Sequence, residues 1–226
     1  MAIAYLNSAS QNDTSNSDTN TNFPYVISVG DCVVFGIAKA TLVGVPSGVT
    51  DNGASGGNTY TLSESYAGIA PALYIFTTIA TVSATNIFPV WTVGSHTAMS
   101  ASRYSGVASI GSNKGSAHTN LVTTGGMAAC TLANANNWAV LIEAHLFAGG
   151  APSAATGNLR VTSAAIATDD YNTMIDNTGS ASVSNTDTWG VAANFSAAYI
   201  ELVPTAVASV SGGGRMPVFF VGSKSG

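Results

Sequence analysis

The sequence predicts an all-β fold, and two of its features lead to that prediction. Stretches of β-branched and aromatic residues recur along the chain, and short clusters of Gly, Asn, Asp and Ser separate them. Short strands at regular spacing with turn residues between them are typical of a β-sandwich or a barrel. The chain has 226 residues, which is long enough to bury a large apolar core, and we expect one domain.

Composition divides the chain into three regions. Residues 7–22 are almost wholly Asn, Ser, Thr and Asp, and such a segment buries too little apolar area to offset its conformational entropy. We therefore expect a polar amino-terminal arm over residues 1–22. A β-sandwich is expected over residues 23–204 and a carboxyl-terminal extension over residues 205–226.

The expected strands begin after Pro24. Residues 25–45 are rich in β-branched side chains but contain three glycines, which predicts strands with bends. Residues 49–62 place the triplets DNG and GGN between β-forming ends, as in a hairpin or an Ω-like loop. Further strands are expected at residues 72–82, 86–93 and 98–107, around Leu121 and Cys130, and at residues 160–168, 181–184, 189–195 and 197–203.

Residues 136–148 fit two structures. Val140, Leu141 and Ala144 would share a face of a helix, whereas Trp138, Val140 and Ile142 alternate as in a strand. No helix cap or surface charge pattern accompanies this segment, so we predict a strand.

Two short apolar segments lie at the ends of the chain, at residues 1–6 and 217–221. Each is joined to the expected sandwich by polar or glycine-rich residues. They either pair back onto the chain's own core or dock on a neighbouring subunit, for example by adding a strand to its sheet. We identify Tyr5, Leu6, Val218, Phe219 and Phe220 as candidate assembly contacts.

Charge is scarce and slightly negative. Only 8% of the residues are charged, compared with roughly a quarter in an average domain, and the net charge is −5. The chain therefore lacks the basic field that attracts nucleic acid, and no apolar run is long enough to span a membrane. Because lysines commonly protect sheet edges, we expect edges that are short, bulged or covered by other subunits.

Catalytic and metal-binding patterns are missing from the sequence. The three histidines, His96, His118 and His145, are far apart, and no nucleophile-elbow, zinc-protease or phosphate-loop motif occurs. We expect no catalytic residue, no metal and no cofactor, and a hydrolase is the least favoured hypothesis. It would require ionisable side chains from different strands to converge.

Four residue sets have a structural and a functional interpretation, and we favour the structural one for each. Asp51, Asn52 and Asn58 suit a turn held by side-chain hydrogen bonds better than a calcium site. Asp169 and Asp170 suit a solvated loop. Trp91, Trp138 and Trp189 suit the core better than a sugar-stacking platform. Cys32 and Cys130 suit two buried thiols better than a disulfide.

Several segments together resemble a jelly-roll, lectin-like β-sandwich module of bacterial and phage surface proteins. They span residues 25–203 and include VGDCVVFGIA at residues 29–38, RYSGV at 103–107, NNWAVLIEAHLF at 136–147 and TWGVAANFSAAYIELV at 188–203. The resemblance implies a single antiparallel jelly-roll sandwich with terminal arms. It carries no catalytic set, because this module serves as a scaffold in unlike proteins.

The expected function is that of a non-enzymatic phage virion protein of the capsid decoration type, which binds the particle through its apolar terminal segments and sheet edges. Residues 1–6 resemble no signal peptide, so synthesis in the host cytoplasm and a place in the virion are expected. The expected partners are further copies of the chain, as a trimer, and the major capsid or another virion protein. The alternative is a carbohydrate-binding adhesion module that takes glycans.

Overall fold

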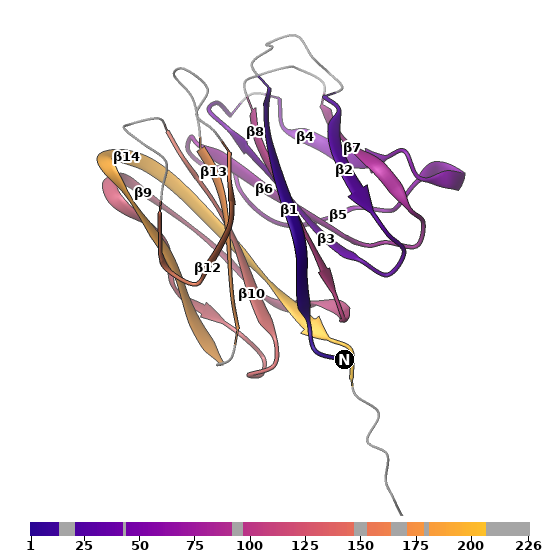
Figure 1. Ribbon diagram of the computed structural model, residues 1–226. Coiled ribbons are helices and arrows are strands. Elements are labelled where there is room, and N and C mark those ends of the chain that lie inside the picture. Colours follow the sequence, from indigo (N-terminus) through magenta and orange to yellow (C-terminus); the bar gives the residue numbers. More distant parts are fainter. Residues whose placement is uncertain are drawn as a thin grey trace, which may run out of the picture.

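The computed structural model describes residues 1–13, 21–42, 44–91, 97–146, 153–163, 171–178 and 181–206. These residues form three antiparallel sheets stacked in layers (Figure 1). One 3-10 turn, Ala54–Gly56, is the only helical element in these ranges. The predicted all-β, antiparallel fold is confirmed. No helix in the described part of the chain is long and apolar enough to cross a membrane.

The central sheet lies between the other two and is built from the amino-terminal half of the chain. Its order is β1-β8-β3-β6-β5. Its strands are β1 (Ala4–Asp13), β3 (Cys32–Lys39), β5 (Thr61–Tyr66), β6 (Ala72–Ile79) and β8 (Thr97–Ser105). Every residue of β3 is buried, because layers cover both of its faces.

The outer sheet covers one face of the central sheet. It consists of β2 (Phe23–Ile27), β7 (Ala84–Trp91) and β4 (Pro46–Asp51), in the order β2-β7-β4. Phe35 and Tyr74 of the central sheet pack there against Phe23, Ile87 and Trp91. Alternate residues of β2 are buried, as expected for a strand with one solvent-facing side.

The carboxyl-terminal sheet covers the opposite face of the central sheet. Its order is β11-β14-β10-β13-β12, and β9 pairs with β14. Its strands are β9 (Val107–Thr131), β10 (Trp138–His145), β11 (Ser153–Thr156), β12 (Asn158–Thr162), β13 (Tyr171–Thr178) and β14 (Ser182–Pro204). Val140 and Ile142 of β10 pack against Val34 and Ile75 of the central sheet. The predicted strand over residues 136–148 is therefore confirmed at β10.

The long strands β9 and β14 extend beyond β10 and cover the far face of this sheet. We call this extension the ribbon, in which residues 122–131 of β9 pair with residues 182–193 of β14. Cys130 and Trp189 of the ribbon pack against Leu141 of β10 and Ile175 of β13. The ribbon thus encloses a second apolar core on the side away from the central sheet.

The sheet order does not confirm a single jelly roll. The orders β1-β8-β3-β6 and β2-β7-β4 match the two sheets of a jelly roll, but β5 pairs with β6 and not with β4. The strands after residue 105 form a sheet of their own. The chain is a layered antiparallel β structure in which these six strands add a third layer.

The segment predicted to be a polar arm is a strand over Ala4–Asp13. It pairs with β8 along its whole length. Its short polar side chains are used at the seam with β12: Ser8 donates to the carbonyl of Arg160 (2.8 Å) and Ser10 to that of Thr162 (3.3 Å). The prediction considered only how little apolar area these residues bury, whereas β1 is held by ladder and side-chain hydrogen bonds.

Both edges of the central sheet are bulged and closed within the chain. The register shifts between Tyr5 and Asn7 in β1 and between Leu62 and Glu64 in β5. At the β5 edge, Lys114 of β9 donates to the carbonyl of Ser63 (2.6 Å). The predicted bulges are confirmed, and the chain itself covers these two edges.

The cysteines are free and buried, at Cys32 in β3 and Cys130 in β9. Burial raises the pKa of each thiol to about 12. The prediction of two buried thiols is confirmed.

Gly36 marks the closest approach of the central and carboxyl-terminal sheets. A Cβ atom at this position would lie 2.4 Å from Cδ1 and 2.9 Å from Cγ2 of Ile142. We expect Gly36→Ala to lower the free energy of unfolding by about 1–3 kcal/mol through overpacking, measured by urea denaturation. Ile142→Ala removes both clashing atoms, so the effects of the two substitutions should be less than additive.

Gly48 of β4 provides the control, since a Cβ atom there would meet nothing within 4 Å. Gly48→Ala should change stability by about 0.5 kcal/mol or less. Equal losses at the two glycines would contradict the packing argument.

Candidate functional site

The two ends of the described chain meet at an apolar pocket. The Met1 nitrogen donates to the carbonyl of Thr205 (2.6 Å), and the Thr205 amide donates to the carbonyl of Gly106 (2.8 Å). The pocket beside them has a volume of about 760 Å³. Its lining is Met1, Ala2, Ile3, Ala135, Asn136, Trp138, Thr178, Pro204, Thr205 and Ala206. We call it the terminal pocket.

Trp138 supplies the only aromatic side chain among these lining residues. It begins β10, is half-buried, and lies edge-to-face on Tyr104 with ring centroids 5.9 Å apart. Tyr104 is fully buried and donates to Asp176. The indole is therefore held on a rigid support, and the lining of the pocket carries no charged side chain.

The structure places two of the five predicted assembly residues. Tyr5 lies against its own chain, with Tyr104 at 6.0 Å and the Arg160 guanidinium over its ring at 4.1 Å. Leu6 is 43% exposed. Val218, Phe219 and Phe220 lie outside the described residues.

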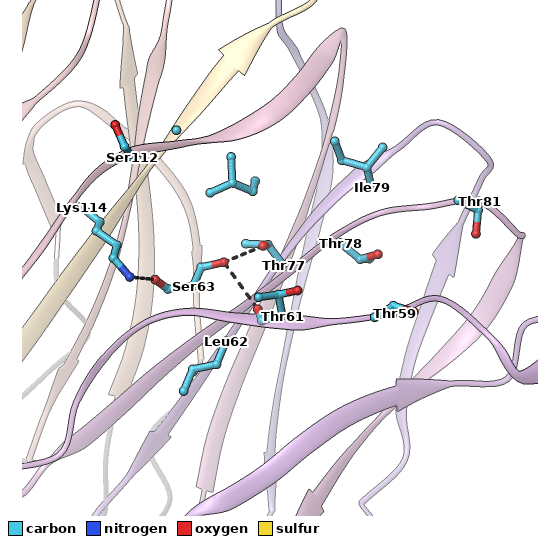
Figure 2. A pocket seen from close by; sticks show the side chains of 12 residues that line it. Thr59, Thr61, Leu62, Ser63, Thr77, Thr78, Ile79, Thr81, Ser112 and Lys114 are labelled. Carbon is cyan, nitrogen blue, oxygen red and sulfur yellow. Dashed lines mark hydrogen bonds between the residues drawn. The ribbon is translucent and has the colours of Figure 1, made fainter.

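A second depression is lined by hydroxyl groups. This hydroxyl groove has a volume of about 560 Å³ and runs between β5, β6 and β9 (Figure 2). Its hydroxyl side chains are Thr59, Thr61, Ser63, Thr77, Thr78, Thr81 and Ser112. Leu62, Ile79 and Ile110 add apolar surface and Lys114 an ammonium group.

Most of these hydroxyls are free to bind a ligand. Ser63 and Thr77 bond to each other (2.6 Å), as Figure 2 shows. Within the described residues, the hydroxyls of Thr59, Thr61, Thr78, Thr81 and Ser112 have no hydrogen-bond partner. Lys114 contacts the carbonyl of Ser63 and lies 3.9 Å from the Glu64 carboxylate.

A sugar-stacking platform, the less favoured interpretation of the tryptophans, does not assemble in the described part of the chain. Trp91 and Trp189 are buried, and Trp138 is half-buried at the terminal pocket. No aromatic side chain whose burial is described is exposed. The prediction that Trp91 and Trp189 belong to the core is confirmed.

The Asp51 loop is a turn held by its own side chains. Asp51 Oδ1 accepts from the amides of Gly53 and Asn58, and Oδ2 accepts from the Asn58 amide group and the Tyr60 hydroxyl. Asn52 Oδ1 accepts from the amides of Thr85 and Asn86. The predicted turn is confirmed, and no group of three or more metal-ligating His, Cys, Asp or Glu residues occurs in the described ranges.

Asp169 and Asp170 lie outside the described ranges, as does His96.

His118 meets a serine that the sequence did not connect with it. His118 Nδ1 lies 3.0 Å from Ser196 Oγ and Nε2 lies 2.9 Å from Asn120 Oδ1. The β9–β14 register pairs His118 with Ser196. However, Ser196 is fully buried and donates its proton to the carbonyl of Pro71 (2.6 Å). The proton of Ser196 is therefore engaged by a carbonyl, whereas nucleophilic catalysis requires the serine to give its proton to the histidine.

Two carboxyl groups also converge from different strands. Glu143 of β10 and Asp187 of β14 are both fully buried in the core beneath the ribbon. Neither lines the terminal pocket or the hydroxyl groove. The pair has the ionisable groups that a hydrolase would need, but it lies in a closed core.

Comparison of the chain with protein-family models, with curated proteins and with solved structures found no match. The resemblance to a lectin-like module therefore remains an expectation from local sequence patterns.

Asp51→Ala tests the structural role of the loop. The substitution leaves the Gly53 amide, both donors of Asn58 and the Tyr60 hydroxyl without their acceptor. We therefore expect the free energy of unfolding to fall by about 3 kcal/mol. The melting temperature, measured by thermal denaturation with and without added Ca²⁺, distinguishes the turn from the calcium site. A calcium-dependent rise in the melting temperature of the wild type, absent in the variant, would support the calcium site instead.

Proposed function

We propose that this protein is a non-enzymatic structural component of a phage virion, of the capsid decoration type, that assembles through the terminal pocket. The observation that carries the proposal is the meeting of residues 1–3 and 204–206 beside Trp138. Segments that follow residue 206 start at this pocket, and they include the apolar residues Val218, Phe219 and Phe220.

The surface chemistry supports association of the protein with other subunits more than it supports a monomer in solution. A chain with 8% charged residues has little electrostatic repulsion between copies. Leu6 is exposed, and so are Met1 (70%) and other apolar side chains. Burial of such surface contributes about 25 cal/mol per Å² before the costs of association are subtracted.

The proposal assigns no catalytic residue. The serine beside His118, Ser196, donates its proton to the carbonyl of Pro71, and the Glu143–Asp187 pair is enclosed. The proposed partners are copies of the chain, as a trimer, and the major capsid protein or another virion protein. The proposed location is the virion, after synthesis in the host cytoplasm.

Removal of residues 207–226 tests the proposal. The last strand of the described structure, β14, ends at Pro204, so the shortened chain should unfold at nearly the same urea concentration as the full chain. Sedimentation velocity should show a trimer for the full chain and a monomer for the shortened one. Self-association that persists unchanged in the shortened chain would contradict the role of this segment.

A pair of substitutions distinguishes association through the terminal pocket from nonspecific apolar association. Trp138→Ala should weaken self-association of the full chain, because it removes the aromatic lining of the pocket. Leu121→Ser is the control, since Leu121 is 74% exposed and does not line the pocket. An equal effect of both substitutions would assign the association to nonspecific apolar contacts.

A second candidate function is glycan binding at the hydroxyl groove. Each hydroxyl both donates and accepts hydrogen bonds, as sugar hydroxyls do, and the groove volume lies within the usual range for ligand sites. Its single ammonium group next to Glu64 favours an uncharged or weakly anionic ligand. Recognition there would use hydrogen bonds in place of aromatic stacking.

The Thr61→Val/Thr81→Val double variant tests this candidate. It keeps side-chain volume but removes two unpartnered hydroxyls, so glycan affinity should fall by about tenfold or more. A glycan array with the wild type finds the ligand, and calorimetry compares the variants. Thr123→Val, an exposed threonine of β9 outside the groove, should bind like the wild type, and an array without hits would remove the candidate.

A further inference from the structure

The core beneath the ribbon contains two acidic side chains without donors. Glu143 and Asp187 are each 0% exposed. None of their four carboxyl oxygens has a hydrogen-bond partner when both groups are treated as carboxylates. A buried carboxylate without a donor or a cation is strongly unfavourable.

The other buried carboxylates of the described chain all have donors, which makes this pair an exception. Arg103 contacts Asp31, and Arg160 contacts Asp176 at 2.6 Å. Asn113, Asn137 and the Ala133 amide donate to Glu201. Asp51 has four donors, as described above, and Thr21 donates to Asp13. The fold thus supplies donors to each of these carboxyl groups, whereas no hydrogen bond between described residues reaches the carboxyl oxygens of Glu143 and Asp187.

The backbone of the ribbon passes directly over this pair. Gly125 of β9 is the register partner of Asp187. A Cβ atom on Gly125 would lie 2.6 Å from Glu143 Oε1 and 2.5 Å from the Trp189 ring. Glu143 comes from the sheet and Asp187 from the ribbon, so any bond between them joins the two layers.

A carboxyl pair in a dry site has one favourable arrangement. If one group keeps its proton, its O–H donates to the other carboxylate, and this supplies the missing hydrogen bond. If both groups ionise, two like charges face each other without solvent.

We infer that Glu143 and Asp187 share one proton and form a pH-sensitive latch that holds the ribbon onto the carboxyl-terminal sheet. The latch is closed while the proton is present. Loss of the proton places two carboxylates against each other, and the ribbon opens to let water reach them.

The pKa directions agree with this arrangement. Burial, followed by the Asp187 carboxyl, raises the pKa of Glu143 well above its ordinary value. Burial also raises the pKa of Asp187, whereas a hydrogen bond from Glu143 lowers it in part. Glu143 is therefore the group that keeps the proton, and Asp187 is the acceptor.

Among the residues that the structure describes, the groups that face the pair include no cation. On β10 the neighbour is His145, which stacks on Trp189 at 4.4 Å and whose pKa burial lowers to about 4. The register partners of Glu143 are Thr173 of β13 and Ala197 of β14. Asp187 is paired with Gly125 of β9 and Ala154 of β11. The remaining titratable groups of this core are Tyr199 and Cys130, and burial raises the pKa of the Cys130 thiol to about 12.

The pH dependence follows from proton counts. An unfolded chain releases both carboxyl protons near about pH 4, whereas the closed latch keeps one. Stability therefore falls as pH rises above about 4, until the proton is lost from the folded state too. His145 acts in the opposite direction. Between about pH 6.5 and about pH 4 the unfolded chain binds a proton at His145 that the folded chain does not, so this residue lowers stability as pH falls through that range.

Hydrogen exchange on the intact protein tests the latch. Exchange rates are corrected for their intrinsic pH dependence and compared between about pH 6 and about pH 9. We expect the opening equilibrium of the ribbon, residues 122–131 and 182–193, to rise by up to about tenfold per pH unit, which is the limit for one proton. Residues 32–39 of the central sheet should keep their protection.

The Glu143→Gln/Asp187→Asn double variant removes the titration but keeps an amide hydrogen bond. Its ribbon protection should not change with pH. Glu201→Gln is the matched control, a buried carboxylate that has donors, and it should retain the pH response of the wild-type ribbon. The same alkaline opening in the double variant would overturn the inference.

A measurement without substitutions guards against a variant that fails to fold. Side-chain carboxyl ¹³C shifts of Glu143 and Asp187 in the wild type, followed by NMR, report their titration directly. A retained proton at neutral pH supports the latch. Titration of both groups near about pH 4 would overturn it.

Discussion

The central sheet must be covered on both faces, and the rest of the structure follows from that requirement. The strands β3 and β6 are apolar on both sides, so neither face can be left to solvent. The outer sheet covers one face with only three strands, and the carboxyl-terminal sheet covers the other. The close approach at Gly36, where Ile142 fills the space of a side chain, shows how tightly the second cover fits. A flat sheet with one open face would require the alternating polar pattern that β3 lacks.

Scarcity of charge affects how the layers are joined. The seams use neutral donors, such as Ser8 and Ser10 on the carbonyls of β12. The buried carboxyl groups of the described chain have hydrogen-bond donors, such as Arg160 at Asp176, where the seam meets the core. Among the described residues, Glu143 and Asp187 are the buried carboxyl groups for which no such donor is found. An exception of this kind requires a proton in place of a cation, which makes this one core sensitive to pH in a way that the others are not.

Local pattern predicted the strands that are apolar but not those that are polar. The cores of β3, β6 and β10 coincide with runs rich in β-branched residues, and the choice of strand for residues 136–148 was confirmed by β10. The strands β1 and β13 were not predicted, because their Asn, Ser, Thr and Asp side chains are typical of loops. In β13, Asn172 and Asp176 are fully buried. Their hydrogen bonds come from Ser100 and Tyr104, which lie on the facing sheet. Such partners are about 70 residues away in sequence, so no local pattern reveals them. The meeting of Glu143 with Asp187 depends on long-range pairing in the same way.

Closure of the central sheet within one chain changes which surfaces association can use. The sequence suggested sheet edges as contacts, but β1 is joined to β12 and β5 to β9. The outer sheet retains the edge strands β2 and β4, which carry Pro24 and Pro46. A proline has no amide hydrogen to donate to an added strand, so these edges are poor templates for pairing. The end where residues 1–3 and 204–206 meet is different, because its pocket is apolar, its indole is rigidly supported, and the chain beyond residue 206 starts there. The proposed association through this end leaves all three layers intact, because among the described residues that line the pocket only Ile3 is a buried member of the cores that join them.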